Sequence, residues 1–231
     1  KTTINKSSKI ESNIPNWIRN DIIKFLGEEK LLSISKAVVE EPFTDIKLKK
    51  NSLNKNNWEK ILNAKRVTED TFRAYNCGLI EKKPFFKEGI WWIQSISATL
   101  PVNIISSIFK KIDHSKVSIL DVGAAPGGKT FQLIEKKFDV TSLDISKKRI
   151  KILEENLRRL DYDTKIICDD FIKFKRKMLF DCVLIDAPCS ASGLIQKKPE
   201  ILLSDKFSHL NELVKKQRKM LEKSSILIKK G

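Results

Sequence analysis

The chain has 231 residues, of which 41% are hydrophobic, which is enough to bury a sizeable core and argues against disorder throughout. Its apolar runs fall far short of the roughly 20 residues that a membrane-spanning helix needs, and its polar, basic start does not resemble a secretory signal, so we expect a cytoplasmic protein. The formal net charge of +16 favours a nucleic acid as the partner, although a general richness in Lys, Asn and Ile would also raise the charge without selecting a partner.

The four cysteines have no CxxC or His-paired spacing, and the two histidines are isolated in polar surroundings. A chain of this size also needs no disulfides to stabilise its core. We therefore expect reduced thiols, no metal site and no histidine chemistry.

The first part of the chain predicts a short tail followed by a small mixed domain. Residues 1–14 are poor in apolar side chains and are expected to form a linker. Apolar residues at helical spacing follow over 17–39, a strand is predicted over 43–48, and Trp58 begins another helical pattern after an Asn-rich turn. We expect a small α+β domain over 15–87 whose Lys and Arg side chains bind nucleic-acid phosphates.

From residue 115 onward, short apolar runs alternate with helical segments such as 147–159. The four runs are VSILDVG, FDVTSLDIS, TKIICDD and FDCVLIDAP. This alternation predicts an α/β domain of Rossmann-like topology over 88–231, with a parallel sheet and helices on both faces. Ligands of such sheets bind at the carboxyl ends of the strands, where the sequence places four carboxylates: Asp121, Asp144, Asp170 and Asp186.

The segment DVGAAPGGKT links the first of these strands to a helix, and its glycines allow a ligand close to the backbone. Residues 123–130 match GxxxxGKT, the phosphate loop of nucleoside triphosphatases, with Asp186 as the magnesium-binding acid. Asp144, at the end of the next strand, instead suits the ribose hydroxyls of an adenosyl ligand, and Asp170 suits its adenine amino group. Pro126 removes one N–H from a phosphate cradle, which favours the adenosyl ligand.

The segment DAPCSASG, residues 186–193, places a carboxylate and a thiol after the fourth strand, where a base would meet a methyl donor. Carbon 5 of cytosine is a weak nucleophile, so a thiolate must first add to carbon 6, and a base removes the carbon-5 proton after methylation. On chemistry alone, Cys189 is the candidate nucleophile and Asp186 the acid that favours the adduct. Cys168 and Cys182 lie within strands, and we expect them to be inert packing residues.

Several of these segments also carry a resemblance to a known family. ILDVGAAPGGKT, LDIS, ENLRRL and LIDAPCSASGLIQKKPEI together resemble the Sun-type, or RsmB-like, RNA cytosine-5 methyltransferases that modify small-subunit ribosomal RNA. The resemblance runs from about residue 15 to the last residue, and DAPCSxxG followed by Pro-acid-Ile is its most specific part. EGIWWIQSISATLP is similar to the segment that leads into the family's catalytic domain, although Ser95 replaces an acid. We expect Trp91 and Trp92 to pack in the core rather than to stack on a base.

The resemblance implies S-adenosylmethionine as the cofactor and a cytidine in RNA, in small-subunit ribosomal RNA, as the substrate. It implies a donor site formed by the glycine loop and the strand ends: Gly123, Ala124, Ala125, Pro126, Gly127, Gly128, Lys129, Asp144, Asp170 and Asp186. It also implies that the nucleophile is a second cysteine, in a Thr-Cys-Ser motif on the next strand, and that Cys189 assists product release. Because the helix-terminating KKG at 229–231 precedes that strand, we expect a chain truncated before the motif.

We therefore expect an S-adenosylmethionine-dependent RNA (cytosine-5) methyltransferase that acts as a monomer and has Cys189 and Asp186 as catalytic candidates. Two alternatives stay open. One is a catalytically inactive RNA-binding fragment, because the implied nucleophile is not in the sequence. The other is a P-loop triphosphatase, which magnesium-dependent nucleotide binding would favour.

Overall fold

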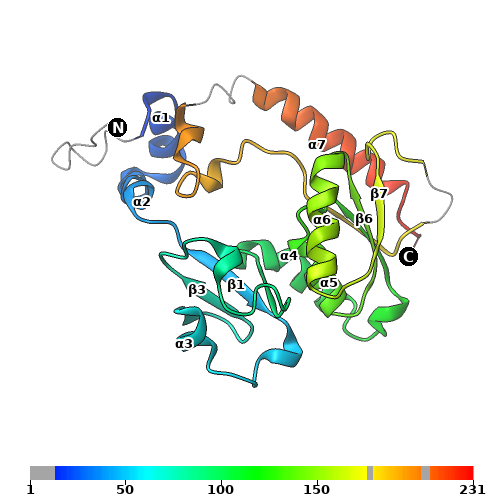
Figure 1. Cartoon of the computed structure of the whole chain (residues 1–231). Coiled ribbons are helices and arrows are strands. Elements are labelled where there is room, and N and C mark those ends of the chain that lie inside the picture. The colour runs from blue at the N-terminus through cyan, green and yellow to red at the C-terminus, as the bar shows by residue number, and fades with distance from the viewer. Residues whose placement is uncertain (1–13, 176–178, 204–208, 231) are drawn as a thin grey trace. The chain divides into compact units, whose positions relative to one another are not determined.

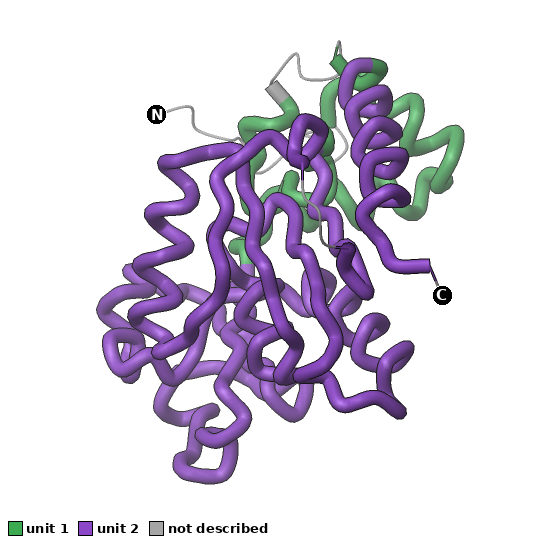
Figure 2. Tube along the Cα trace, turned by 90° about the vertical axis from the view of Figure 1, so that its right-hand side faces the viewer, with its two compact units in different colours: residues 1–42, 189–211 green, residues 43–188, 212–231 purple. Residues whose placement is uncertain are grey.

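The computed structural model of the chain describes residues 14–175, 179–203 and 209–230. The chain divides into two compact units, shown in different colours in Figure 2: residues 1–42 with 189–211, and residues 43–188 with 212–231. Within the described ranges, no helix combines the length and the apolar character needed to cross a membrane. The expected division at 87/88 into an RNA-binding and a methyltransferase domain stays a prediction.

The first unit is built on two helices, α1 (Asn16–Leu26) and α2 (Glu28–Val39), where apolar spacing predicted helical structure. Two short 3-10 helices from the later part of the chain, η5 (Ser192–Leu194) and η6 (Pro199–Leu203), belong to the same unit. Apolar residues from both parts of the chain form its core: Ile14, Ile22, Leu31, Ile195, Ile201 and Leu202. The segment after the Pro-Cys loop therefore packs with Ile14 and with helices α1 and α2.

The second unit contains two four-stranded sheets, and the smaller one has the order β2-β3-β1-β4 with antiparallel neighbours. Its strands are β1 (Thr44–Leu48), β2 (Lys65–Arg66), β3 (Thr71–Ala74) and β4 (Trp91–Ile93). Helix α3 (Trp58–Leu62) covers one face, where alternate strand residues meet it in a core: Ile46, Leu48, Trp58, Leu62, Phe72, Ala74 and Trp91. The strand predicted over 43–48 and the helix beginning at Trp58 are confirmed.

The larger sheet is parallel and has the order β7-β6-β5-β8. Its strands are β5 (Ser118–Val122), β6 (Asp139–Asp144), β7 (Lys165–Cys168) and β8 (Cys182–Ile185). All four predicted strands are present. The strand order reverses at β5, which has β6 on one side and β8 on the other, and such a reversal opens a crevice at the carboxyl ends of the strands.

Helices cover both faces of the larger sheet (Figure 1). They are α4 (Ile96–Ile108), α5 (Gly128–Glu135), α6 (Lys147–Arg159) and α7 (Leu210–Ser225). The first three lie on one face, which includes Ile119 and Ile166, whereas Met220 of α7 packs with Leu120 on the other. This arrangement confirms the predicted Rossmann-like α/β fold.

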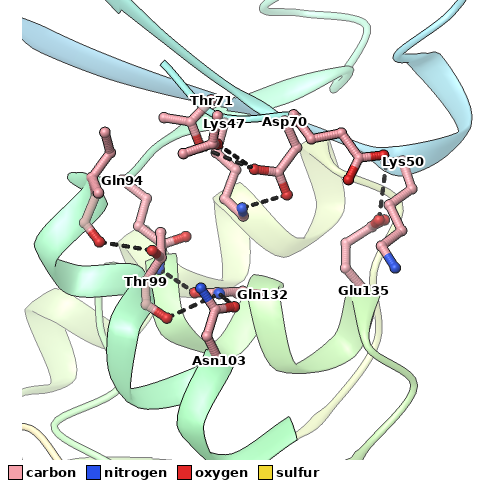
Figure 3. Close-up of polar contacts among 12 residues, drawn as sticks. Lys47, Lys50, Asp70, Thr71, Gln94, Thr99, Asn103, Gln132 and Glu135 are labelled. Carbon is pink, nitrogen blue, oxygen red and sulfur yellow. Dashed lines mark hydrogen bonds and ion pairs between the residues drawn. The ribbon is translucent and has the colours of Figure 1, made fainter. Parts of the chain in front are cut away.

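A tryptophan from the smaller sheet joins it to the larger one. Trp92 is 2% exposed, its ring meets that of Phe131 in α5 edge-to-face at 6.1 Å between centroids, and its indole N–H donates to Gln94 Oε1 at 2.9 Å. Gln94 donates in turn to Gln132 of α5 at 2.7 Å (Figure 3). Trp91 is also fully buried, so both tryptophans pack in the core as predicted.

Cys168 departs from the expectation that it is a buried packing residue. Its side chain is exposed, because β7 lies at the edge of the larger sheet and Cys168 ends that strand. Cys182 in β8 is half-buried, and burial raises the pKa of its thiol, which keeps the thiol protonated.

Replacing Trp92 by alanine is expected to lower the free energy of unfolding by about 3–5 kcal/mol, because it opens a cavity between the two sheets and leaves Gln94 Oε1 without its donor. Urea unfolding followed by circular dichroism measures the loss. Ile93→Ala is the control, since the Ile93 side chain is 41% exposed and its truncation should cost less than about 1 kcal/mol. Equal losses in the two variants would contradict the joining role of Trp92.

Candidate functional site

A cavity of about 170 Å³ lies at the carboxyl ends of the parallel strands, where the strand order reverses. Its wall carries four carboxylates: Asp144, Asp169, Asp170 and Asp186. The acids that sequence analysis placed after the second, third and fourth strands therefore come together in one cavity. Gly123, Arg149 and Pro188 also line it, as do Lys216 and Met220 of α7.

The glycine loop joins β5 to α5 and requires glycine at two positions. Gly123 has a φ of 77°, and a Cβ there would lie 2.7 Å from the carbonyl oxygen of Asp186. Gly127 has a φ of 120°, and a Cβ there would lie 2.0 Å from the ring of Phe131. Only glycine permits these backbone conformations and close approaches without a shift of the surroundings.

The backbone amides at the start of this loop are already engaged within the protein. The N–H groups of Gly123 and Ala124 donate to the Leu143 carbonyl at 2.8 and 3.2 Å, and the N–H of Ala125 donates to Asp144 Oδ2 at 3.2 Å. A phosphate loop needs such N–H groups to point at the phosphates. Their engagement argues against the triphosphatase alternative.

Asp144 organises the loop from the end of β6. Its side chain is 1% exposed, it accepts the N–H of Ser146 at 3.0 Å in addition to that of Ala125, and it pairs with Arg149 at 3.1 Å. Arg149 also donates to the carbonyl of Ala125, so one arginine connects α6 to the loop. Sequence analysis missed Arg149, although its position in the first turn of the helix after LDIS was an available signal.

Asp121 lies within β5 and is not part of the cavity wall. Its side chain is fully buried and accepts a hydrogen bond from Thr130 Oγ1 at 2.6 Å, and that hydroxyl lies 3.2 Å from Ser142 Oγ. Burial, together with the negative charges of Asp186 and Asp144, raises the pKa of Asp121 to about 6. This acid therefore holds the start of α5 to the sheet. It lies near the carboxyl end of its strand, as predicted, but it does not line the cavity.

Asp186 follows β8 and forms an ion pair with Lys129 of α5, with 2.7 Å between Oδ2 and Nζ. Its side chain is 55% exposed, so it borders the cavity and also faces solvent. Cys189 is exposed and directly follows the lining residue Pro188 in the chain, but it belongs to the first compact unit. The catalytic roles of Cys189 and Asp186 stay predictions.

The predicted donor-binding residues fall into two groups. Gly123, Asp144, Asp170 and Asp186 line the cavity. The others form the loop between β5 and α5 or its first helical turn: Ala124, Ala125, Pro126, Gly127, Gly128 and Lys129. The structure shows the contacts of these residues within the protein, and their roles in binding the methyl donor stay predictions.

Helix α7 supplies two lining residues that sequence analysis missed, Lys216 and Met220. For this segment, sequence analysis predicted only the helix-terminating signal at 229–231. It gave no sign that the helix borders the ends of the parallel strands, because that depends on how α7 packs on the sheet.

The larger sheet is parallel, has acids at successive strand ends, and carries after β5 a glycine loop whose amides are engaged within the protein. These features define a Rossmann-like domain of the methyltransferase type. A sequence model of the family described as 16S rRNA methyltransferase RsmB/F matches residues 109–231. The chain belongs to this family, as the sequence motifs predicted.

Two curated proteins illustrate the relationship. Ribosomal RNA small subunit methyltransferase B of Vibrio vulnificus (strain YJ016) is 31% identical over 157 residues, which cover 66% of this chain and 35% of that protein. The protein of the same name from Cronobacter sakazakii (strain ATCC BAA-894) is 28% identical over 221 residues, covering 90% of this chain and 50% of that protein. The chain thus spans about a third to a half of the length of these relatives.

A solved structure shares the fold. The crystal structure of NSun6 from Pyrococcus horikoshii with SFG superposes with a TM-score of 0.75 and 17% sequence identity, covering 94% of this chain and 81% of that one. At this identity the likeness supports the architecture alone.

The buried carboxyl group of Asp121 is expected to make stability depend on pH. Its folded-state pKa of about 6 lies above the ordinary value of 3.8, so its contribution to stability is present below about pH 4 and is lost as the pH rises through about 6. Relative to Asp121→Asn, the unaltered protein should lose about 3 kcal/mol of unfolding free energy over this range. Urea unfolding of both proteins at a series of pH values measures the difference, and a difference that stays constant with pH would refute the expectation.

Proposed function

We propose that this protein transfers a methyl group from S-adenosylmethionine to carbon 5 of a cytidine in small-subunit ribosomal RNA. The observation that carries the proposal is the cavity with four carboxylates at the carboxyl ends of β5 to β8, in a chain of the RsmB/F family. The names of the relatives, which refer to ribosomal RNA methylation, support the substrate class.

The cavity supports an adenosyl ligand over a nucleoside triphosphate. Asp144 ends β6, where a carboxylate accepts the hydroxyls of a ribose, and Asp170 follows β7, where it suits the adenine amino group. The four carboxylates of the cavity outnumber its two lining cations, Arg149 and Lys216, and this excess of negative charge favours a ligand with a positively charged sulfonium over a triphosphate. The structural relative NSun6 holds SFG, an analogue of S-adenosylmethionine, which is consistent with this assignment.

The side chains after β8 are assigned to the cytosine. The donor supplies the methyl group, while Asp186, oriented by its ion pair with Lys129, hydrogen-bonds the edge of the base. We assign Cys189 to product release, as the family resemblance implies, rather than to the first attack on carbon 6.

The proposal also includes a monomeric state, a cytoplasmic location and RNA binding by residues 15–87. The net charge of +16 supports RNA as the partner, because Lys and Arg neutralise phosphates. Exposed cations of the smaller sheet, such as Lys65 and Arg66, are suited to this contact.

Calorimetric titration with S-adenosylmethionine, S-adenosylhomocysteine and magnesium-ATP tests the donor site. We expect both adenosyl ligands to bind and magnesium-ATP not to bind. Asp144→Ala should weaken the binding of the adenosyl ligands by about tenfold or more, because it removes the acceptor of the ribose hydroxyls.

Two variants control this experiment. Asp139→Ala changes an exposed aspartate at the amino end of the same strand and should bind like the unaltered chain. Arg149→Gln disturbs the loop but keeps the Asp144 carboxylate, so it should lose less affinity than Asp144→Ala. Binding of magnesium-ATP alone would overturn the proposal, and RNA binding without binding of either adenosyl ligand would favour the inactive RNA-binding alternative.

RNA that contains 5-fluorocytidine tests the role of Cys189, since fluorine blocks proton removal from carbon 5 and traps a thiol adduct at carbon 6. If Cys189 assists release, the chain incubated with this RNA and S-adenosylmethionine should form no denaturation-resistant adduct that depends on Cys189. An adduct that disappears in Cys189→Ser but persists in Cys168→Ser, which changes another exposed thiol, would identify Cys189 as the nucleophile.

A further inference from the structure

Tyr75 presents an aromatic ring to solvent just beyond the end of β3. Its side chain is 55% exposed, whereas Phe72 of the same strand and Trp91 of β4 are 0% exposed. Single exposed aromatic residues are common on protein surfaces, so the surroundings of the ring decide whether it has a role.

Tyr75 belongs to a fixed group of side chains. Its ring meets the Phe43 ring edge-to-face, with 6.3 Å between centroids and 70° between planes. The Arg73 guanidinium lies 3.6 Å from the centroid of the Phe43 ring and is held by two hydrogen bonds to Asp45, of 2.8 and 3.2 Å. A flat ligand that stacks on such a group immobilises few additional side chains, which lowers the entropic cost of binding.

A polar hollow of about 440 Å³ opens beside this group. Its lining includes Glu59, Asn63, Lys65, Arg73, Tyr75 and Asn76. The volume lies within the range of ligand pockets, roughly 300–1,000 Å³. The two asparagines offer amide donors and acceptors of the kind that pair with the edge of a base.

The hollow opens where the edge of β3 extends past its neighbour. β2 pairs with β3 only through Lys65–Arg73 and Arg66–Phe72. Lys65 of β2 is an exposed cation that lines the hollow, and a cation beside a stacking ring is suited to the phosphate of a nucleotide.

This end of the smaller sheet is connected to the start of the glycine-loop helix. Asp45, which holds Arg73, also accepts the N–H of Ile96 at the start of α4, at 3.0 Å. Just before α4, the Gln94 side chain lies 3.5 Å from the position of a Cβ on Gly128, the first residue of α5. Asp45 therefore contacts both Arg73 of the stacking group and the segment that leads into α4.

We infer that Tyr75 and the hollow beside it bind one nucleotide of a single-stranded RNA, with the base stacked on the tyrosine ring. Asn63 and Asn76 face the edge of the base, and Lys65 contacts the phosphate. Single strands suit this arrangement because their bases expose the flat faces that a duplex hides. The inference rests on the proposed function in taking RNA as the ligand, and it adds a nucleotide subsite on the smaller sheet, separate from the donor cavity.

Fluorescence anisotropy with a short, labelled single-stranded RNA of mixed sequence tests the inference. Tyr75→Ala should weaken binding by roughly fivefold to a hundredfold, the effect of losing one stacked base. Tyr75→Trp should retain the affinity, because it keeps a ring of similar or larger area. Ile108→Ala is the control, since it removes a 68% exposed side chain from α4, outside residues 15–87, and should bind RNA like the unaltered chain.

Two further measurements make the outcomes distinguishable. Lys65→Gln should reduce the slope of log affinity against log salt by roughly 0.7, whereas Tyr75→Ala should leave that slope unchanged. Titration of Tyr75→Ala with S-adenosylhomocysteine should match the unaltered chain, which shows that the variant is folded.

Unchanged RNA affinity in Tyr75→Ala, or affinity as weak in Tyr75→Trp as in Tyr75→Ala, overturns the inference. Binding of duplex RNA or of an acidic peptide in preference to single-stranded RNA also overturns it. If the unaltered chain binds S-adenosylhomocysteine but not RNA, the nucleotide subsite is refuted while the donor site stands.

Discussion

The Asp144 carboxylate accepts the amides of Ala125 and Ser146 and pairs with Arg149, while its side chain is almost completely excluded from water. A buried carboxylate is tolerated only where hydrogen bonds and a cation replace its hydration. These contacts join β6, the glycine loop and α6, so one charge determines where the loop lies. Because the loop amides are used in this way, the site suits a ligand recognised by carboxylates at the strand ends rather than by backbone N–H groups.

Buried polar contacts also make the smaller sheet part of the same compact unit as the parallel sheet. Trp92 and Gln94 reach across to Phe131 and Gln132 of α5, the helix that begins directly after the glycine loop. The side-chain polar atoms of Trp92, Gln94 and Gln132 all have hydrogen-bond partners, as a buried polar network requires. The surface that we assign to RNA and the loop that we assign to the donor are consequently held by one set of packing contacts.

Local patterns in the sequence predicted the elements that depend on local structure. Alternation of apolar runs predicted all four strands of the larger sheet, and helical spacing predicted α6 over 147–159. Periodicity did not reveal that Cys168 is exposed, because it does not distinguish an edge strand from a central one. It also did not reveal that Asp121, near the carboxyl end of β5, is buried against Thr130 rather than exposed to the cavity.

The sequence by itself determined the family, the parallel α/β fold and the acids at the strand ends, because these depend on motifs and on repeats along a single segment. Only the tertiary structure decided which acids face the cavity, that Arg149 neutralises Asp144, and that α7 brings Lys216 and Met220 to the wall. The physical reason is that burial and pairing depend on side chains from elements far apart in the chain. Their positions are set by the packing of helices on the sheet, which no single segment encodes.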